Sequence, residues 1–184
     1  MPIQTPICDF GQKALPFELK STDNKIISLD NIKGENGTLI MFICNHCPYV
    51  KAVTKEIVED CNELKKIGIN SVAICSNDAV NYPDDSFDNM IKFSKDNQFS
   101  FPYLQDETQE IAKAYDAVCT PDFFGYDKDL GLQFRGRLRE LKNFVPVKDG
   151  KSDLLKAMKQ VVETGKGPQD QIPSAGCGIK WKYD

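Results

Sequence analysis

A strand-length apolar run followed at once by two cysteines and a proline constrains this chain more than any other feature. Residues 38–43 carry apolar side chains at nearly every position. A strand that is apolar on both faces belongs in the middle of a sheet covered on both sides. Cys44, Cys47 and Pro48 follow, and an apolar stripe with helical spacing begins at Val50. We therefore expect a buried strand, a short turn that carries both cysteines, and a helix.

Strands and helices alternate along the rest of the chain. The sequence predicts a hairpin around the turn 22–25, strands over 38–43, 69–75, 101–104, 122–126 and 132–134, and helices that begin near Pro48, Ser86, residues 106–109 and Ser152. The third helix is predicted because residues 106–109 resemble a capping box. This order implies an α/β fold, with a central mixed β-sheet flanked by helices. We expect one domain over residues 1–184, with an irregular C-terminal tail over 165–184 docked on the core.

Charge and hydropathy exclude two classes of partner. The net charge is −4 and the pI is near 5.1, so no positive field covers the chain and nucleic acid is not expected as a partner. The one basic run, residues 135–139, is expected to be a solvated strand end. No apolar run approaches the roughly 20 residues that cross a bilayer. The N-terminus also lacks the features of a signal peptide, so we expect a cytoplasmic protein without a membrane partner.

Seven cysteines are spread along the chain: Cys8, Cys44, Cys47, Cys61, Cys75, Cys119 and Cys177. An odd number does not suit a disulfide framework, so at least one thiol must be free. Cys61 lies within the apolar stripe of the first long helix, and Cys75 ends a buried-type strand. We therefore interpret these two as small core residues.

Cys47 occupies the position expected of a reactive thiol. Pro48 suits the first position of a helix, which makes Cys47 the N-cap. A thiolate there faces unpaired backbone N–H groups and the positive end of the helix dipole, so the pKa of Cys47 should fall. His46 either lowers this pKa further, when it is protonated and close, or is a loop residue whose side chain diverges. Both alternatives remain open at this stage.

Cys44 precedes Cys47 by three residues, and the pair allows three interpretations. The two cysteines can close a disulfide if their Cα atoms lie within about 7 Å. They can instead form half of a metal site, although a zinc site needs about four Cys and His ligands. Because the chain has a single His and no second close cysteine pair, we expect no metal and no cofactor. The third interpretation is an inert structural role.

Several segments of the sequence resemble those of a known group of redox proteins: residues 42–52, 76–78, 82–86, 120–123 and 176–181. Through them the chain resembles the thioredoxin-like superfamily. More closely, it resembles the peroxiredoxin-like branch of the alkyl hydroperoxide reductase and thiol-specific antioxidant group. The resemblance implies a thioredoxin-like fold and a redox-active cysteine at position 47. It also implies a cis peptide bond between Thr120 and Pro121, beside the nucleophile, where the Thr120 backbone would bind an extended peptide or mixed-disulfide partner.

The register of the cysteines departs from the patterns of these families. Aligning Cys47 with the thioredoxin nucleophile puts Val50 at the place of the resolving cysteine. In the peroxiredoxin pattern, Cys44 takes the place of a threonine and Ile40 that of a proline. The family also uses an arginine near the sulfur, and no arginine precedes Arg135 in this chain. The resemblance therefore supports neither ordinary dithiol thioredoxin activity nor efficient peroxidase chemistry.

The leading hypothesis is an antioxidant thiol-disulfide oxidoreductase. Cys47 attacks a disulfide, and Cys44 or Cys177 resolves the mixed disulfide. Cys177, flanked by glycines in the tail, can alternatively serve only to dock the tail. Cys119 is a further candidate, although packing is its expected role. The alternatives to this activity are a thiol-dependent peroxidase and a redox-inert thioredoxin-fold binding module.

The expected substrate site and partners follow from the same hypothesis. His46, Thr120 and Pro121 are the residues expected to bind substrate. The expected partners are protein or small-molecule thiols and disulfides, or peroxides. The chain is expected to act as a monomer or a homodimer.

Overall fold

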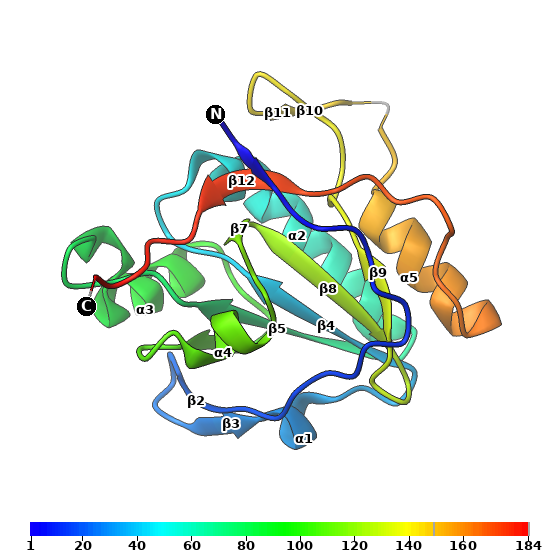
Figure 1. Ribbon diagram of the computed structural model, residues 1–184, viewed down its shortest axis with the longest axis horizontal. Helices are drawn as coiled ribbons and strands as arrows, with labels where there is room; N and C mark the ends of the chain where they lie inside the picture. The colour runs from blue at the N-terminus through cyan, green and yellow to red at the C-terminus, as the bar shows by residue number, and fades with distance from the viewer. Residues whose placement is uncertain (149, 184) are drawn as a thin grey trace.

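A mixed sheet of seven strands lies at the centre of the molecule, in the order β3-β2-β6-β5-β4-β8-β9 (Figure 1). The computed structural model describes residues 1–148 and 150–183. Its strands are β1 (Ile3–Gln4), β2 (Glu18–Ser21), β3 (Ile26–Ser28), β4 (Gly37–Phe42), β5 (Ile69–Cys75), β6 (Tyr103–Gln105), β7 (Cys119–Thr120), β8 (Asp122–Asp127), β9 (Leu132–Arg135), β10 (Leu141–Lys142), β11 (Val145–Pro146) and β12 (Ala175–Gly178). Its helices are α1 (Leu29–Ile32), α2 (Pro48–Lys66), the 3-10 turn η1 (Pro83–Asp85), α3 (Phe87–Asp96), α4 (Glu110–Ala114) and α5 (Asp153–Thr164).

Strand β4 is buried along its whole length, as its apolar run predicts. It pairs in parallel with β5 and antiparallel with β8. Alternate side chains enter different cores, because successive residues of a strand point to opposite faces of the sheet. Leu39 and Met41 join the core cluster that includes residues of α2 and α5. Ile40 and Phe42 join the cluster that includes residues of α1 and α4. The mixed sheet is thus covered on both faces, and the α/β class is confirmed.

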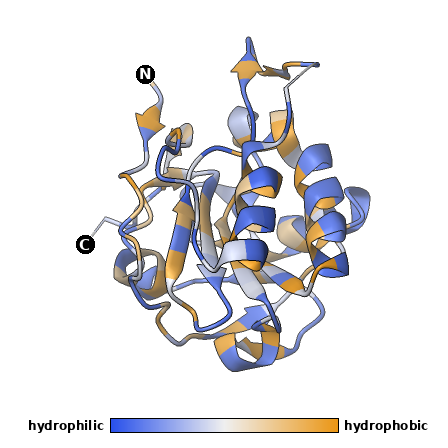
Figure 2. Cartoon of the chain, turned by 90° about the vertical axis from the view of Figure 1, so that its right-hand side faces the viewer, coloured by the Kyte–Doolittle hydropathy of each residue, from blue (hydrophilic) through white to orange (hydrophobic). Residues whose placement is uncertain are grey.

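The longer helices lie against the sheet through one apolar face each. Helix α2 buries an apolar stripe that runs from Val50 to Leu64, and its last turn carries Lys65 and Lys66. Figure 2 shows helices banded in orange and blue, the pattern of amphipathic helices. Ser86 and Ser152 cap α3 and α5 by accepting backbone N–H hydrogen bonds, as predicted. Within the described residues, no helix is long and apolar enough to cross a membrane.

The expected capping box at residues 106–109 is wrong. Helix α4 begins at Glu110, and its N-cap Gln109 has a left-handed backbone without a capping side chain. Asp106 accepts the N–H groups of Ile111 and Ala112 instead. Gln109 is buried, and its amide donates to the carbonyl oxygens of Ser76 and Lys180. The glutamine therefore links the residue that follows β5 to the C-terminal tail rather than closing the helix end.

The tail that was expected to be irregular contains a strand. Within residues 165–184, Ala175–Gly178 form β12, which lies between β1 and β7 in a separate three-stranded sheet. Figure 1 shows this strand beside the N-terminal segment. Thr5 donates its N–H to the carbonyl of Ser174, and Ser174 donates its hydroxyl to the carbonyl of Pro121. The tail therefore joins both the start of the chain and the loop that precedes β8.

Candidate active site

Cys47 lies between the end of β4 and the start of α2, where it is the N-cap of the helix. Its backbone is extended, and Pro48 takes the first helical position. The prediction of an N-cap cysteine is therefore confirmed. The Cys47 side chain has no exposed surface, and Cys44 is equally buried.

The loop between β7 and β8 closes over both sulfur atoms. The Thr120–Pro121 peptide bond is cis, as expected. In its thiol form, Cys47 Sγ donates to the backbone carbonyl of Thr120, which lies 3.2 Å away. Cys44 Sγ lies 3.4 Å from the Thr120 hydroxyl. The structure thus brings together Cys44, Cys47 and the Thr-Pro step, which are up to 76 positions apart in the sequence.

Cys177 reaches the same place from the other end of the chain. Strand β12 pairs antiparallel with β7, and in this register Cys177 lies opposite Thr120. Its thiol lies close enough to the sulfur of Cys47 to help lower the pKa of Cys47. Unlike Cys44 and Cys47, Cys177 is only partly buried. Three thiols therefore converge beside one loop, and Cys177 is the one with access to solvent.

The surroundings of Cys47 favour its thiolate. The Cys44 thiol makes the largest contribution by donating a hydrogen bond, and it lowers the pKa of Cys47 well below its ordinary value. Burial acts in the opposite direction. The backbone N–H of Val50, the Cys177 thiol and the Thr120 side chain add further stabilisation of the charge. Cys47 is thus the candidate nucleophile of the cluster.

The two neighbouring thiols are held in the protonated form. The pKa of Cys44 is raised by its hydrogen bond to Cys47, then by burial, and then by the charge of Asp85. Burial also raises the pKa of Cys177, and the hydrogen bond to Cys47 adds to this shift. The cluster therefore holds one thiolate between two thiol donors, which is the arrangement needed for an attacking sulfur and a proton-bearing partner.

We predict that one thiolate persists in acidic solution. Because the pKa of Cys47 is lowered, its thiolate is present at neutral pH and is lost only as the pH falls through the lowered value. An ultraviolet titration of the reduced protein should show this step well below the ordinary thiol pKa of about 8.5. The step should be absent from Cys47→Ser. A Cys47 that ionises at the ordinary pKa would contradict the assignment and favour the redox-inert binding module.

His46 contacts an acid rather than Cys47. Its Nδ1 atom lies 2.6 Å from Oδ2 of Asp85, in a geometry outside that of a hydrogen bond. The shift in the pKa of Cys47 has its causes in Cys44, Val50, Cys177 and Thr120, and His46 is not among them. The expected site residue His46 therefore belongs to the rim of the cluster, and the alternative of a direct effect on Cys47 is not supported.

Asp85 is a site residue that the sequence interpretation missed. It is buried at 1% exposure and accepts hydrogen bonds from the Asn45 N–H at 2.7 Å and the Asn77 amide at 2.8 Å. These contacts fix the turn between β4 and α2 to the loop after β5. The local sequence Asp84-Asp85-Ser86 indicates only a helix start, so its pattern carries no signal for this role.

Cys44, His46 and Asp85 place possible metal-ligating atoms within 4.8 Å of one another. Three donors are one fewer than a closed tetrahedral zinc site uses. Both oxygens of Asp85 already accept hydrogen bonds, from Asn45 and Asn77. These two hydrogen bonds satisfy the buried carboxylate oxygens, so their burial does not require a bound ion.

Of the other buried cysteines, Cys61 and Cys75 lie in the core and Cys119 lies in strand β7. Cys61 and Cys75 are almost fully buried, so the packing interpretation is confirmed for both. Burial raises the pKa of each to about 12. Cys119 is also fully buried, opposite Gly178 in the pairing of β7 with β12, and burial raises its pKa. Cys119 therefore has the packing environment that was expected of it.

Arg135 corrects the expectation of a solvated basic run. The guanidinium is buried at 5% exposure and pairs with Asp122 through Nη2 at 2.9 Å and Nε at 3.3 Å. It also donates to the carbonyl of Asp116. A buried guanidinium needs such partners because desolvation of an unpaired charge is costly. This arginine is thus bound to the strand beside the site, and none of its hydrogen bonds goes to Cys47.

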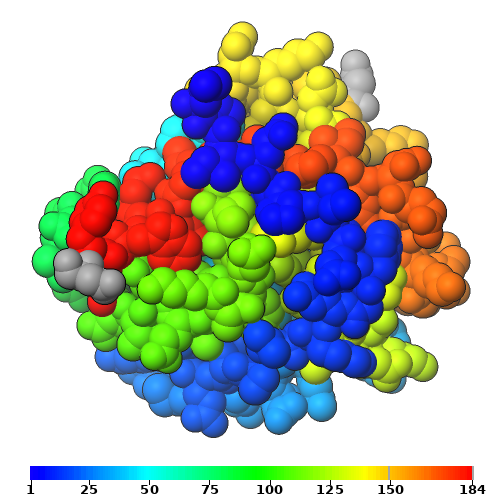
Figure 3. Space-filling view, viewed as in Figure 1, coloured from blue at the N-terminus to red at the C-terminus, as the bar shows by residue number. Residues whose placement is uncertain are grey.

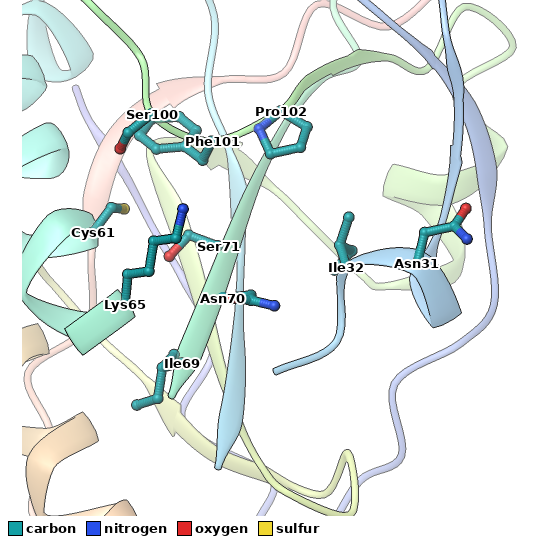
Figure 4. Close-up of a pocket in the computed structure, with 10 residues that line it drawn as sticks. All are labelled: Asn31, Ile32, Cys61, Lys65, Ile69, Asn70, Ser71, Ser100, Phe101 and Pro102. Atoms are coloured by element: carbon teal, nitrogen blue, oxygen red, sulfur yellow. The ribbon is translucent and has the colours of Figure 1, made fainter. Parts of the chain in front are cut away.

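Two cavities of the molecule differ in their distance from the cysteine cluster. A cavity of about 320 Å³ is lined by Cys61, Lys65, Ile69 and Ser71 near the start of β5, the end away from the cysteine cluster (Figure 4). A second cavity of about 240 Å³ lies beside the site, with Pro121 and the two arginines Arg137 and Arg139 in its wall. The geometry of the thiols therefore locates the site, whereas the first cavity is unrelated to it.

Comparison with known proteins gives the same picture at the level of family and fold. The family model described as "AhpC/TSA family" matches residues 10–136. An uncharacterized conserved protein from Geobacillus kaustophilus is 42% identical, with a TM-score of 0.92 over 100% of this chain and 98% of that one. A hypothetical protein from Sinorhizobium meliloti is 31% identical, with a TM-score of 0.91 over 100% of both chains. The thioredoxin domain of a thiol-disulfide oxidoreductase from Bacteroides vulgatus shares the fold at 15% identity, with a TM-score of 0.62 over 83% of this chain and 97% of that one. No curated protein sequence matches the chain.

Proposed function

The chain belongs to the AhpC/TSA family, and from this premise we propose that it is a thiol-disulfide oxidoreductase whose nucleophile is the Cys47 thiolate. One observation carries the proposal. The sulfur of Cys47 has a lowered pKa and lies within hydrogen-bond reach of two protonated thiols, Cys44 and Cys177. A thiolate beside a second thiol can both attack a disulfide and release the product.

The reaction proceeds in two exchanges. The Cys47 thiolate attacks one sulfur of a substrate disulfide, forms a mixed disulfide and expels the first substrate thiolate. Cys177 then loses its proton and attacks the Cys47 sulfur, which expels the second substrate thiolate. The two released thiolates take up protons, so one substrate disulfide becomes two thiols and the protein dithiol becomes a disulfide. An external thiol reductant restores the dithiol.

Cys177 is the resolving residue in this scheme, rather than Cys44 or Cys119. Its sulfur is partly exposed, so both the proton and the product can leave towards solvent. Cys44 is fully buried, and the charge of Asp85 further disfavours its thiolate. Cys119 is buried as well, and its thiol donates to the Pro121 carbonyl.

The oxidised cysteine pair tests the proposal. The reduced protein is treated with one equivalent of a small disulfide, the remaining thiols are alkylated, and the pairing is mapped by mass spectrometry. We expect a Cys47–Cys177 disulfide, with Cys61 and Cys75 still free as internal controls. A Cys47–Cys44 pair would reassign the resolving residue, and a product that leaves Cys47 reduced would refute the proposed nucleophile.

A thiol-dependent peroxidase is the second candidate, and membership of the AhpC/TSA family favours it. Peroxide oxidation would convert the Cys47 thiolate to a sulfenic acid. The buried pairing of Arg135 with Asp122 speaks against Arg135 as an arginine that polarises peroxide at this sulfur. Rapid consumption of stoichiometric peroxide, with the sulfenic acid trapped at Cys47, would establish this activity in place of the first.

The cellular setting follows from the same chemistry. The odd number of cysteines suits a reducing compartment, and we propose the cytoplasm. The proposed partners are thiols and disulfides.

A further inference from the structure

The strand edge next to Cys47 is already occupied by the chain itself. Thr120, whose carbonyl contacts Cys47 Sγ, belongs to β7. The neighbour of β7 on this side is β12, and β12 is covered in turn by β1. Figure 3 shows the C-terminal segment, in red, on the surface between the blue N-terminal segment and the green segment beneath. No outside strand can therefore pair with Thr120 on the side that β12 occupies while this sheet is formed.

This edge matters because of how polypeptides present a disulfide. An extended polypeptide binds a protein strand by adding its own backbone to an unpaired edge. To bring a disulfide to Cys47, such a segment must lie along β7, since Thr120 is the strand residue against the reactive sulfur. Cys177 occupies that place in the structure, opposite Thr120, whose carbonyl contacts the Cys47 sulfur. The tail therefore stands where the cysteine of a polypeptide substrate would stand.

The tail is fixed by contacts on both sides of Cys177. On one side, Ser174 bonds to Thr5 and to the Pro121 carbonyl. On the other, Ile179 is buried, and Lys180 accepts from Asp78 N–H and donates its own N–H to Asn77. These bonds are distributed over several elements, so removing β12 from β7 requires many of them to break together.

Gly176 is the glycine of β12 whose backbone lies closest to the Thr120 carbonyl. A Cβ atom at position 176 would collide with the carbonyl group of Thr120. That obstacle is backbone, which cannot rotate away. At Gly178 an added Cβ would meet only Cδ1 of Ile3, at 2.7 Å, the movable end of a side chain. Glycine is thus required at position 176 for β12 to lie against Thr120, and the second glycine offers a matched comparison.

We propose that β12 is a specificity element, seated by Gly176, that excludes extended polypeptides from Cys47 and restricts the enzyme to low-molecular-weight disulfides. The inference rests on the proposed oxidoreductase function and adds the substrate class. A small disulfide needs only the Cys177 side chain to rotate, because that side chain is partly exposed and lies opposite Thr120, beside the Cys47 sulfur. A polypeptide needs the whole backbone pairing of β12 with β7 to open.

Substrate preference in two variants tests the proposal. Reduction of hydroxyethyl disulfide and of insulin is measured for the wild type, Gly176→Ala and Gly178→Ala, with dithiothreitol as the reductant and the uncatalysed rate subtracted. We expect the wild type to reduce hydroxyethyl disulfide and to leave insulin near the uncatalysed rate. Gly176→Ala should gain at least about tenfold in insulin reduction, because the freed edge of β7 admits a strand. Gly178→Ala should keep the wild-type preference.

The outcomes distinguish failure of polypeptide exclusion by β12 from failure of the oxidoreductase function. A wild type that reduces insulin as readily as hydroxyethyl disulfide overturns the exclusion, and this result does not depend on whether Gly176→Ala folds. A folded Gly176→Ala that reduces the small disulfide but gains nothing on insulin also overturns it. A wild type that reduces neither substrate refutes the oxidoreductase function itself, and the inference falls with it.

Discussion

Replacement of Cys47 by serine is expected to lower the rate of disulfide reduction by at least about a thousandfold, because loss of a catalytic nucleophile leaves no other group to form the covalent intermediate. Cys44 and Cys177 are poor substitutes, since burial still raises the pKa of each when Cys47 is replaced. The fold should persist, because the serine hydroxyl is close in size to the thiol and can still donate to the Thr120 carbonyl.

Cys61→Ala provides the control for this prediction. Cys61 is buried on the helix that Cys47 caps, but it lies about four turns further along, away from the thiols that surround Cys47. The rate of disulfide reduction by Cys61→Ala should stay within about twofold of the wild-type rate, because the substitution removes no reacting group. The measurement is the steady-state reduction of a small disulfide, with circular dichroism to verify the fold. Full activity of Cys47→Ser would refute the assignment of Cys47 as the nucleophile.

Replacement of Arg135 by methionine is expected to cost about 3–5 kcal/mol of unfolding free energy, the range found when one partner of a buried ion pair is removed. The Asp122 carboxylate would remain at 0% exposure without its main counter-charge. Burial already raises the pKa of Asp122, and Arg135 is the group that counteracts this shift. The expected loss is large relative to the roughly 5–15 kcal/mol that stabilise a typical domain.

A matched substitution at a more exposed pair separates burial from charge. Arg137 pairs with Asp153 at 2.7 Å, but the two side chains are 28% and 40% exposed. Arg137→Met should therefore cost only about 0–1 kcal/mol. Urea denaturation measures both variants, with an unchanged slope required for comparison. The cost of Arg135→Met should also shrink as the pH falls, because protonation removes the buried charge of Asp122. If both variants lose the same unfolding free energy, burial of the Arg135–Asp122 pair is not the reason for its contribution to stability.

Features that depend on neighbouring residues were predicted well from the sequence. The apolar run of β4, the N-cap position of Cys47 before Pro48, and the serine caps of α3 and α5 all appear in the structure. Strand periodicity and capping are properties of a few consecutive residues, so a linear pattern records them. The capping box at residues 106–109 failed because the tertiary contacts of Gln109 with Ser76 and Lys180 override the local preference.

Features that join distant segments came only from the structure. Asp85 lies 40 positions from the Asn45 N–H that it accepts, and its sequence context resembles an ordinary helix start. The sequence indicates that Arg135 belongs to a solvated basic run, whereas in the structure its side chain is buried and paired with Asp122. In both cases a polar group is placed by a partner whose position depends on the arrangement of the sheet, and composition gives no information about that arrangement.

The sequence by itself determined the α/β class, the buried strand that leads to Cys47, and the identity of the candidate nucleophile, because strand period, helix start and thiol position are local. It left open which cysteine lies beside Cys47 and treated residues 165–184 as irregular. Only the tertiary structure placed β12 against β7 and put Cys177 beside the reactive sulfur. The reason is physical: pairing of β12 with β7 satisfies backbone hydrogen bonds across 57 positions of sequence, between Thr120 and Cys177, and such long-range pairing is decided by the whole fold.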